Sequence, residues 1–248
     1  MFTGRAAPLS NAGLTSCSQL LGTGLAELWT LLSVETSGCG FLPDRRPAIL
    51  FERHIFNKRT KGKFGEPTPG GYLGGALEYQ RLEAAMAQDR IAALESASWG
   101  IGQVMGFNFK ATGFAGVEEM VAAMVDSEDA QLLGVVQFLR GRELDSRLAR
   151  HDWEGFARGY NGVSFKKNQY DSRLAAAHAG FVSGGLPDVQ VREVQLRLTF
   201  LGFDVAGVDG VAGKRTRSAV RFFREQVGLP PGETIDRPLL EKLRGPGE

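Results

Sequence analysis

The sequence predicts a mainly α-helical protein that contains a small β-containing lobe and ends in a second, smaller helical domain. Hydrophobic residues recur at helical spacing through most of the chain, whereas residues 38–75 are rich in Gly and Pro and hold one apolar run, Ala48-Ile49-Leu50-Phe51. A glycine-rich linker at residues 181–187 separates the expected large domain, residues 1–180, from the expected small domain, residues 188–248.

Composition narrows the class of protein. The chain has 248 residues, 43% of them hydrophobic and 23% charged, which is enough for one large core and one small one. The net charge is +1 and basic residues do not alternate with aromatic ones, so we expect no nucleic-acid partner. No apolar stretch approaches the roughly eighteen residues that span a bilayer, so no stable membrane insertion is expected. The N-terminus lacks the apolar region of a secretory signal, which predicts synthesis in a cytoplasm.

Cysteine and histidine usage predicts neither disulfides nor a metal site. Cys17 and Cys39 are too few for a disulfide framework and are expected to be reduced thiols. His54, His151 and His178 are scattered, and the chain contains neither HExxH nor CxxC. We therefore expect no metal and no cofactor.

The first predicted helix, from roughly Gly24 to Thr36, ends in a carboxylate at an unusual place. Its apolar stripe consists of Leu25, Leu28, Trp29 and Leu32, and Glu35 lies at the end of that stripe. The negative end of the helix dipole and burial both disfavour ionisation, so both raise the pKa of Glu35. A carboxylic acid that keeps its proton near neutral pH is what general acid catalysis requires, and Glu35 is the candidate acid.

Further elements follow in order. A short strand is expected at residues 48–51, and helical periodicity returns at residues 76–95, 117–125 and 132–139. Ser127 is the expected N-cap of the helix through 132–139, and Gly141 its expected end. Asp152 is the expected N-cap of a short helix from Trp153 to Tyr160, and another helix is expected at residues 168–178.

The small domain is predicted to contain three helices. The apolar stripes that define them are Val191, Val194, Leu198 and Leu201, then Ala219, Val220, Phe223 and Val227, then Leu239, Leu240 and Leu243. Three helices in about sixty residues make a marginal core, which suits an added module better than an enzyme.

Three motifs in the large domain occur in an order that resembles a known superfamily. They are Val34-Glu35-Thr36-Ser37-Gly38, the segment from Ser98 to Gly106 that contains Gly102-Gln103-Val104-Met105, and Tyr160-Asn161-Gly162. This set resembles the lysozyme-like superfamily, which includes goose-type lysozymes and soluble lytic transglycosylases. The N-acetylmuramidase domain of phage endolysins is the closer match, because its pattern also includes Gly40-Phe41-Leu42 and the stretch from Leu50 to Phe56. The resemblance covers roughly residues 20–180.

The resemblance implies a lysozyme-like fold whose cleft binds the glycan strands of peptidoglycan. It implies that Glu35 protonates the leaving oxygen of the β-1,4 bond between N-acetylmuramic acid and N-acetylglucosamine. The physical argument for Glu35 as an acid leads to the same role independently.

The second carboxylate is less well defined by the sequence. Glu52 directly follows the predicted strand, from where it could face Glu35, and we assign it as the second catalytic residue; it could equally pair with Arg53, His54 or a helix end. Asp44, followed by two arginines, is better explained as a loop ion pair.

The substrate-binding candidates are Ser98, Gln103, Met105, Tyr160 and Asn161. The glycines around Gln103 allow the backbone to approach a sugar, and its amide can hydrogen-bond an acetamido group. The same segment could also be a tight turn, and both roles can hold together. Trp99 could stack on a sugar ring or pack in the core.

The small domain resembles the peptidoglycan-binding type 1 module. That family is marked by D-G-x-x-G-x-x-T followed by A-V-x-x-F, and this chain has Asp209, Gly210, Gly213, Thr216 and then Ala219-Val220-x-Phe222-Phe223. Asp209, Gly210 and Thr216 are the candidate residues of the module, and Asp209 and Gly210 are expected to shape its turn. Arg224 departs from the Gln that the family often has after the Phe. The resemblance implies a module that holds the enzyme on the wall through the stem peptide; a helical bundle without a ligand is the alternative.

Together these features predict a monomeric endolysin that works on the bacterial wall. The module would raise the local concentration of the enzyme at an insoluble substrate. Such enzymes are made in the cytoplasm of the infected bacterium and reach the wall through a separate pore. The alternatives are a lytic transglycosylase that leaves 1,6-anhydro ends, a wall-binding adaptor without catalysis, and a toxin of bacterial antagonism with the same chemistry.

Overall fold

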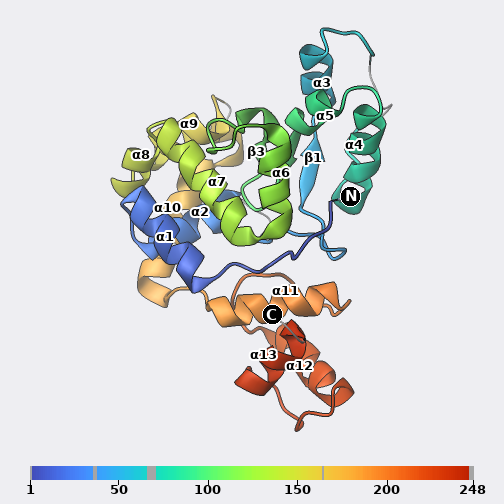
Figure 1. Ribbon diagram of the computed structural model, residues 1–248. Coiled ribbons are helices and arrows are strands. Elements are labelled where there is room, and N and C mark those ends of the chain that lie inside the picture. The colour runs from blue at the N-terminus through green and yellow to red at the C-terminus, as the bar shows by residue number, and fades with distance from the viewer. Residues whose placement is uncertain (1, 36–37, 66–70, 164, 246–248) are drawn as a thin grey trace.

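The computed structural model describes residues 2–35, 38–65, 71–163 and 165–245, and of Glu35 it describes the backbone but not the side chain. These residues form thirteen α-helices and one three-stranded sheet (Figure 1). The helices are α1 (Asn11–Leu21), α2 (Leu25–Glu35), α3 (Arg53–Arg59), α4 (Glu78–Met86), α5 (Arg90–Glu95), α6 (Val117–Asp126), α7 (Glu128–Gly141), α8 (Asp145–Ala149), α9 (Trp153–Asn161), α10 (Tyr170–Gly184), α11 (Val189–Phe200), α12 (Lys214–Gln226) and α13 (Arg237–Arg244). The strands are β1 (Ile49–Phe51), β2 (Ala97–Trp99) and β3 (Val104–Met105).

The large domain has two sides with α6 and α7 between them (Figure 1). On one side lie α3, α4, α5 and the sheet, whose strands pair antiparallel in the order β1-β2-β3. On the other side lie α1, α2, α8, α9 and α10. One hydrophobic core runs through both sides, from Phe51 and Trp99 of the sheet to Leu28 of α2 and Leu174 of α10.

Several predicted boundaries are confirmed by capping contacts. The hydroxyl of Ser127 accepts a hydrogen bond from Ala130 N, the carboxylate of Asp152 accepts one from Gly155 N, and α7 ends at Gly141. The helical stretch predicted at residues 76–95 is broken in two, because Asp89 caps a new helix, α5. Helix α1, which Ser10 caps, and helix α8 were not predicted.

The predicted linker is only partly irregular. Helix α10 was expected to end near residue 178 but continues to Gly184, so four residues of the predicted 181–187 linker are helical. The irregular connection to α11 is residues 185–188. Both cysteines are free thiols, as predicted, and burial together with the charge of Asp129 raises the pKa of Cys17 to about 12. No helix of the described residues is both long and apolar enough to cross a bilayer.

The small domain packs directly against the large one. It has its own core, built from α11, α12 and α13, but Leu196 of α11 and Val208 join Ala6 and Phe41 of the large domain in a separate buried cluster. The rings of Phe41 and Phe200 meet edge to face, with centroids 6.4 Å apart. The two domains therefore share a hydrophobic interface in addition to their covalent connection.

A buried ion pair lies in this interface. The guanidinium of Arg192 in α11 donates from both Nη atoms to the two carboxylate oxygens of Glu128, and the side chains are 1% and 0% exposed. Glu128, the first residue of α7, also accepts from Leu9 N at 2.9 Å and from Gly40 N at 2.8 Å. Burial acts to raise the pKa of Glu128, but the charge and hydrogen bonds of Arg192 outweigh it, so the pKa is lowered.

We predict that Arg192→Met lowers the free energy of unfolding by about 3–5 kcal/mol, because it leaves a buried carboxylate without its cation. Urea denaturation of the full chain measures this. The control is Arg215→Met, which removes an exposed ion pair with Asp204 and should cost less than about 1 kcal/mol. Equal midpoints for the two variants would contradict the prediction.

We also predict an acid-dependent loss of stability that originates at Glu128. Because the folded-state pKa of Glu128 lies below the unfolded value of about 4.3, the pair stabilises the fold above that pH, and the contribution is lost as pH falls towards the folded-state pKa. Unfolding free energies measured between about pH 6 and pH 3 should show a smaller acid-dependent decline for Glu128→Gln than for the wild type. The exposed-carboxylate variant Glu118→Gln should keep the wild-type decline.

Candidate active site

The sheet has one buried face and one partly open face. In the antiparallel register Ser98 is paired with both Leu50 and Met105, so these three side chains lie on the same face. Leu50 and Met105 are half-buried, whereas the opposite face carries the core residues Ile49, Phe51, Ala97, Trp99 and Val104. The structure thus places two of the predicted substrate-binding residues together on this face, where Ser98 is buried and Met105 is half-buried.

Gln103 stabilises the turn between β2 and β3. Its amide nitrogen donates to Ala48 O at 3.1 Å and to Gly100 O at 2.8 Å, and its Oε1 accepts from the Ser98 hydroxyl at 2.8 Å. Both amide hydrogens and the oxygen are therefore engaged within the protein. Gln103 therefore has the turn role, with Ser98 as its partner, and the sugar-binding role of both residues stays a prediction.

Tyr160 joins the third motif to the second. Its hydroxyl donates to Gly102 O at 3.0 Å, and its ring stacks on Phe156 at 5.7 Å between centroids. Asn161 is the next residue and the last of α9, and it is half-buried. Trp99 is fully buried and donates to Leu94 O, so it packs in the core and is not a sugar platform.

The loop that follows the first motif contacts α7, and α7 in turn contacts the β2–β3 turn. Helix α2 ends at Glu35; the side chain of Glu35, together with Thr36 and Ser37, lies outside the described residues. The loop resumes at Gly38, whose carbonyl accepts from Arg192 at 2.7 Å. Gly40 packs against Gln131 of α7 so closely that a Cβ at residue 40 would lie 1.8 Å from Gln131 Oε1.

Gln131 links this loop to the β2–β3 turn. Its Oε1 accepts from Ile101 N at 2.7 Å, and its Nε2 donates to Met124 O and, at 3.4 Å, to Gly40 O. Glu128 and Gln131 are three residues apart and lie on the same face of α7. Helix α7, which none of the motifs includes, therefore joins the loop after the first motif to the second motif.

Glu52 follows β1 and directly precedes α3. Alternation along the strand places it on the open face with Leu50, and its side chain is 18% exposed. Its Oε2 accepts from the Tyr72 hydroxyl at 2.9 Å and lies 3.3 Å from His54 Nδ1. The sequence offered a pairing of Glu52 with His54 as an alternative role, and the structure contains that pairing. Glu52 nevertheless stays on the open side of the sheet.

Asp44 forms an ion pair within its loop. Arg46 donates to its carboxylate from Nη2 at 2.6 Å and Nε at 2.9 Å. Partial burial acts to raise the pKa of Asp44, but the hydrogen bonds from the Arg46 side chain and backbone outweigh it, so the pKa is lowered. The structure agrees with the loop ion pair that the sequence favoured for Asp44.

A second buried ion pair, between Glu78 and Arg81, was not predicted. Glu78 is fully buried and accepts from Leu73 N, Gly74 N and Phe51 N as well as from Arg81 at 2.6 Å. It therefore fixes both the end of β1 and the loop that carries Tyr72 to Glu52. The signal in the sequence was a Glu and an Arg three residues apart at the start of a helix.

The motif residues of the small domain shape its own loop. Gln195 of α11 donates to Asp209 Oδ1 at 2.8 Å and to Thr216 Oγ1 at 3.2 Å, and it accepts from Asp209 N and Gly210 N. Gly210 has φ +77° and packs against Pro187 and Asp188, where a side chain would clash. Arg224 is buried and donates to Pro230 O, Thr234 O and Asp236.

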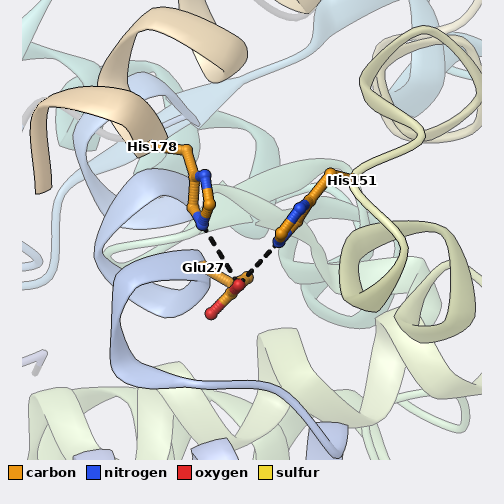
Figure 2. A group of neighbouring side chains, drawn as sticks. All are labelled: Glu27, His151 and His178. Carbon is orange, nitrogen blue, oxygen red and sulfur yellow. Dashed lines mark hydrogen bonds and ion pairs between the residues drawn. The ribbon is translucent and has the colours of Figure 1, made fainter. Parts of the chain in front are cut away.

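Two of the scattered histidines meet in space. His151 and His178 both approach the carboxylate of Glu27, far from either in sequence, so that the three could hold a metal ion (Figure 2). The expectation of no metal rested on short sequence motifs, and such motifs cannot detect ligands that three separate segments supply.

Comparisons with known proteins cover both domains. A family model described as N-acetylmuramidase matches residues 24–182, and one described as a putative peptidoglycan binding domain matches residues 187–236. Among solved structures, the crystal structure of the Burkholderia AP3 phage endolysin is similar to this chain, with a TM-score of 0.66 and 36% sequence identity, over 73% of this chain and 72% of that chain. No curated protein matches the chain. The matches and the helical architecture confirm the fold class implied by the sequence motifs.

Proposed function

The chain belongs to the N-acetylmuramidase family, a family of glycoside hydrolases, and on that premise we propose that it cleaves the β-1,4 bond between N-acetylmuramic acid and N-acetylglucosamine with Glu35 as the general acid. The observation that carries this proposal is the set of contacts that connects the second and third motifs to the loop after the first. Tyr160 contacts the β2–β3 turn, and Gln131 joins that turn to the loop after Glu35.

The proposed acid gains its properties from its position. Glu35 ends α2, where the partial negative charge of the helix C-terminus favours the protonated form. Donation of that proton to the glycosidic oxygen makes the sugar a better leaving group as the bond breaks. Arg192 and Glu128 hold the loop from Gly38 to Gly40, which begins three residues after the acid.

Glu52 is the proposed second carboxylate. It lies on the open face of the sheet with Leu50, Ser98 and Met105, next to the surface along which we propose that the glycan binds. Tyr72 and His54 hold its carboxylate in place through Oε2. In this position Glu52 would activate the attacking water or stabilise the charge that develops on the sugar.

The small domain is a peptidoglycan-binding module, and we propose that it binds the stem peptide. Because Asp209, Gly210 and Thr216 are engaged in folding their loop, the ligand surface lies elsewhere on the module. A groove of about 440 Å³ is lined by residues that include the half-exposed ring of Phe222 and the cations Lys214 and Arg215. Asp204 also lines the groove and pairs with Arg215, so Lys214 is the cation without this partner. An aromatic ring beside these side chains suits a short peptide that carries carboxylates.

We place the enzyme, as a monomer, in the infected bacterium, where it is made in the cytoplasm and acts on the wall after release. The similar solved structure is a phage endolysin, which supports this setting. The module would then keep the enzyme at its insoluble substrate between cleavage events.

Glu35→Gln should reduce the lysis of permeabilised bacteria by about 10²–10⁴-fold, because it removes the transferable proton and keeps the shape of the side chain. Glu52→Gln should also lower the rate, and Glu118→Gln, which alters an exposed carboxylate on α6, should not. Circular dichroism of each variant controls for folding. If Glu35→Gln kept wild-type activity, Glu35 would not be the general acid.

Product masses test the reaction type. Hydrolysis adds one water to each cut, so digested glycan strands should end in reducing N-acetylmuramic acid, which mass spectrometry detects. Products that lack this water mass would identify a lytic transglycosylase, in which the C6 hydroxyl attacks instead of water. A folded wild-type protein that releases no fragments would instead favour the non-catalytic adaptor.

Phe222→Ala should weaken binding to purified peptidoglycan by about tenfold or more, because the ring would lose its buried contact with the ligand. Arg237→Ala, on the exposed side of α13, is the control. Sedimentation with the insoluble wall measures both variants. An amidase can remove the stem peptides from peptidoglycan. The wild type should bind this stripped glycan weakly, about as weakly as Phe222→Ala binds intact peptidoglycan. Undiminished binding of the wild type to the stripped glycan would exclude the stem peptide as the ligand.

A further inference from the structure

Three side chains from separate parts of the large domain converge at the start of α2. Glu27 lies in the first turn of α2, His151 in the connection between α8 and α9, and His178 within α10 (Figure 2). Their ligand atoms all lie within 4.8 Å of one another. The group lies two turns of α2 away from Glu35, so it is separate from the candidate active site.

The two imidazoles point at the same oxygen. His151 Nε2 lies 2.7 Å and His178 Nε2 3.1 Å from Glu27 Oε1. Two imidazole nitrogens and a carboxylate oxygen therefore lie close enough together to share one cation.

The histidine rings are held in place by their neighbours. The His151 ring lies nearly parallel to Trp153 at 5.2 Å between centroids, and Trp153 also packs on His178 at 5.2 Å. The backbone of His151 has φ +56°, a left-handed conformation that costs a non-glycine residue energy and that the surrounding structure must maintain. The ring positions are therefore built into the fold and do not result from free rotation at the surface.

Two imidazoles and a carboxylate form a donor set that suits zinc and neighbouring first-row divalent cations. We propose that Glu27, His151 and His178 bind one Zn²⁺-class cation through His151 Nε2, His178 Nε2 and a Glu27 oxygen. Zinc bonds of about 2.0–2.2 Å in tetrahedral geometry separate ligand atoms by roughly 3.3 Å. The ligand atoms here lie within 4.8 Å of one another, so side-chain rotation would bring them to that spacing.

The cation would join three segments that bear on the active site. It would tie the first turn of α2, the helix that ends at Glu35, to α10 and to the segment that leads into α9, which carries Tyr160. Half of the His151 side chain is exposed, so a cation can reach the site and a water can fill the fourth position. The expected role is to stabilise the large domain, because a ligand that binds the folded state alone raises its stability by mass action.

The test uses the untagged full chain, stripped with EDTA and then titrated with ZnCl₂ in a calorimeter. We expect one Zn²⁺ per chain and a melting temperature that rises with free Zn²⁺. His178→Ala and Glu27→Gln should each weaken binding by at least roughly tenfold to a hundredfold, since each removes a ligand. Substitution by Co²⁺ should give the visible absorption of a four-coordinate site in the wild type and not in the variants.

His54→Ala is the matched control, because His54 is the third histidine of the chain and lies on α3, away from this group. It should keep wild-type Zn²⁺ affinity. Glu27→Gln retains a hydrogen-bonding side chain, and its circular dichroism shows whether the fold is kept. Wild-type protein that takes up no Zn²⁺ would overturn the proposal, as would binding that survives the double variant Glu27→Gln/His178→Ala.

Discussion

The buried contact between Glu128 and Arg192 is the interaction on which most of the arrangement depends. One carboxylate at the start of α7 meets the N-terminal segment at Leu9, the loop after α2 at Gly40 and the small domain at Arg192. A charge in the protein interior is tolerated only when it is paired and its remaining lone pairs are satisfied. Glu128 meets that condition only if all three segments are in place, so their positions are coupled.

A second buried carboxylate, Glu78, is paired and hydrogen-bonded in the same way on the side of the large domain that contains the sheet. Glu78 is also fully buried, pairs with Arg81 and accepts hydrogen bonds from three backbone N–H groups. An ionised carboxylate can accept about four hydrogen bonds, which makes it suited to fixing irregular backbone that has no partner in a helix or sheet. One such carboxylate orders the loop beyond Glu35, and the other orders the loop that supports Glu52.

The small domain is more closely integrated with the large domain than its sequence indicated. Its composition indicated an added module after a glycine-rich linker, but α10 continues through most of that linker and α11 packs on Phe41 and Ala6. Arg192 of the module also donates to Gly38, close to the end of α2. The domain that belongs to a peptidoglycan-binding family thus contributes directly to the structure of the catalytic domain.

The helical class, the three helices of the module, the caps at Ser127 and Asp152 and the family could all be predicted from the sequence, because each depends on residues that are close together in the chain. Tertiary structure decided which residues meet. Gln131 joins two motifs, Gln103 is engaged within its turn, and Glu27 lies 124 and 151 residues from the histidines that it contacts. Periodicity reports which face of an element is apolar, but contacts between distant segments follow from how those faces pack, and no local pattern contains that information.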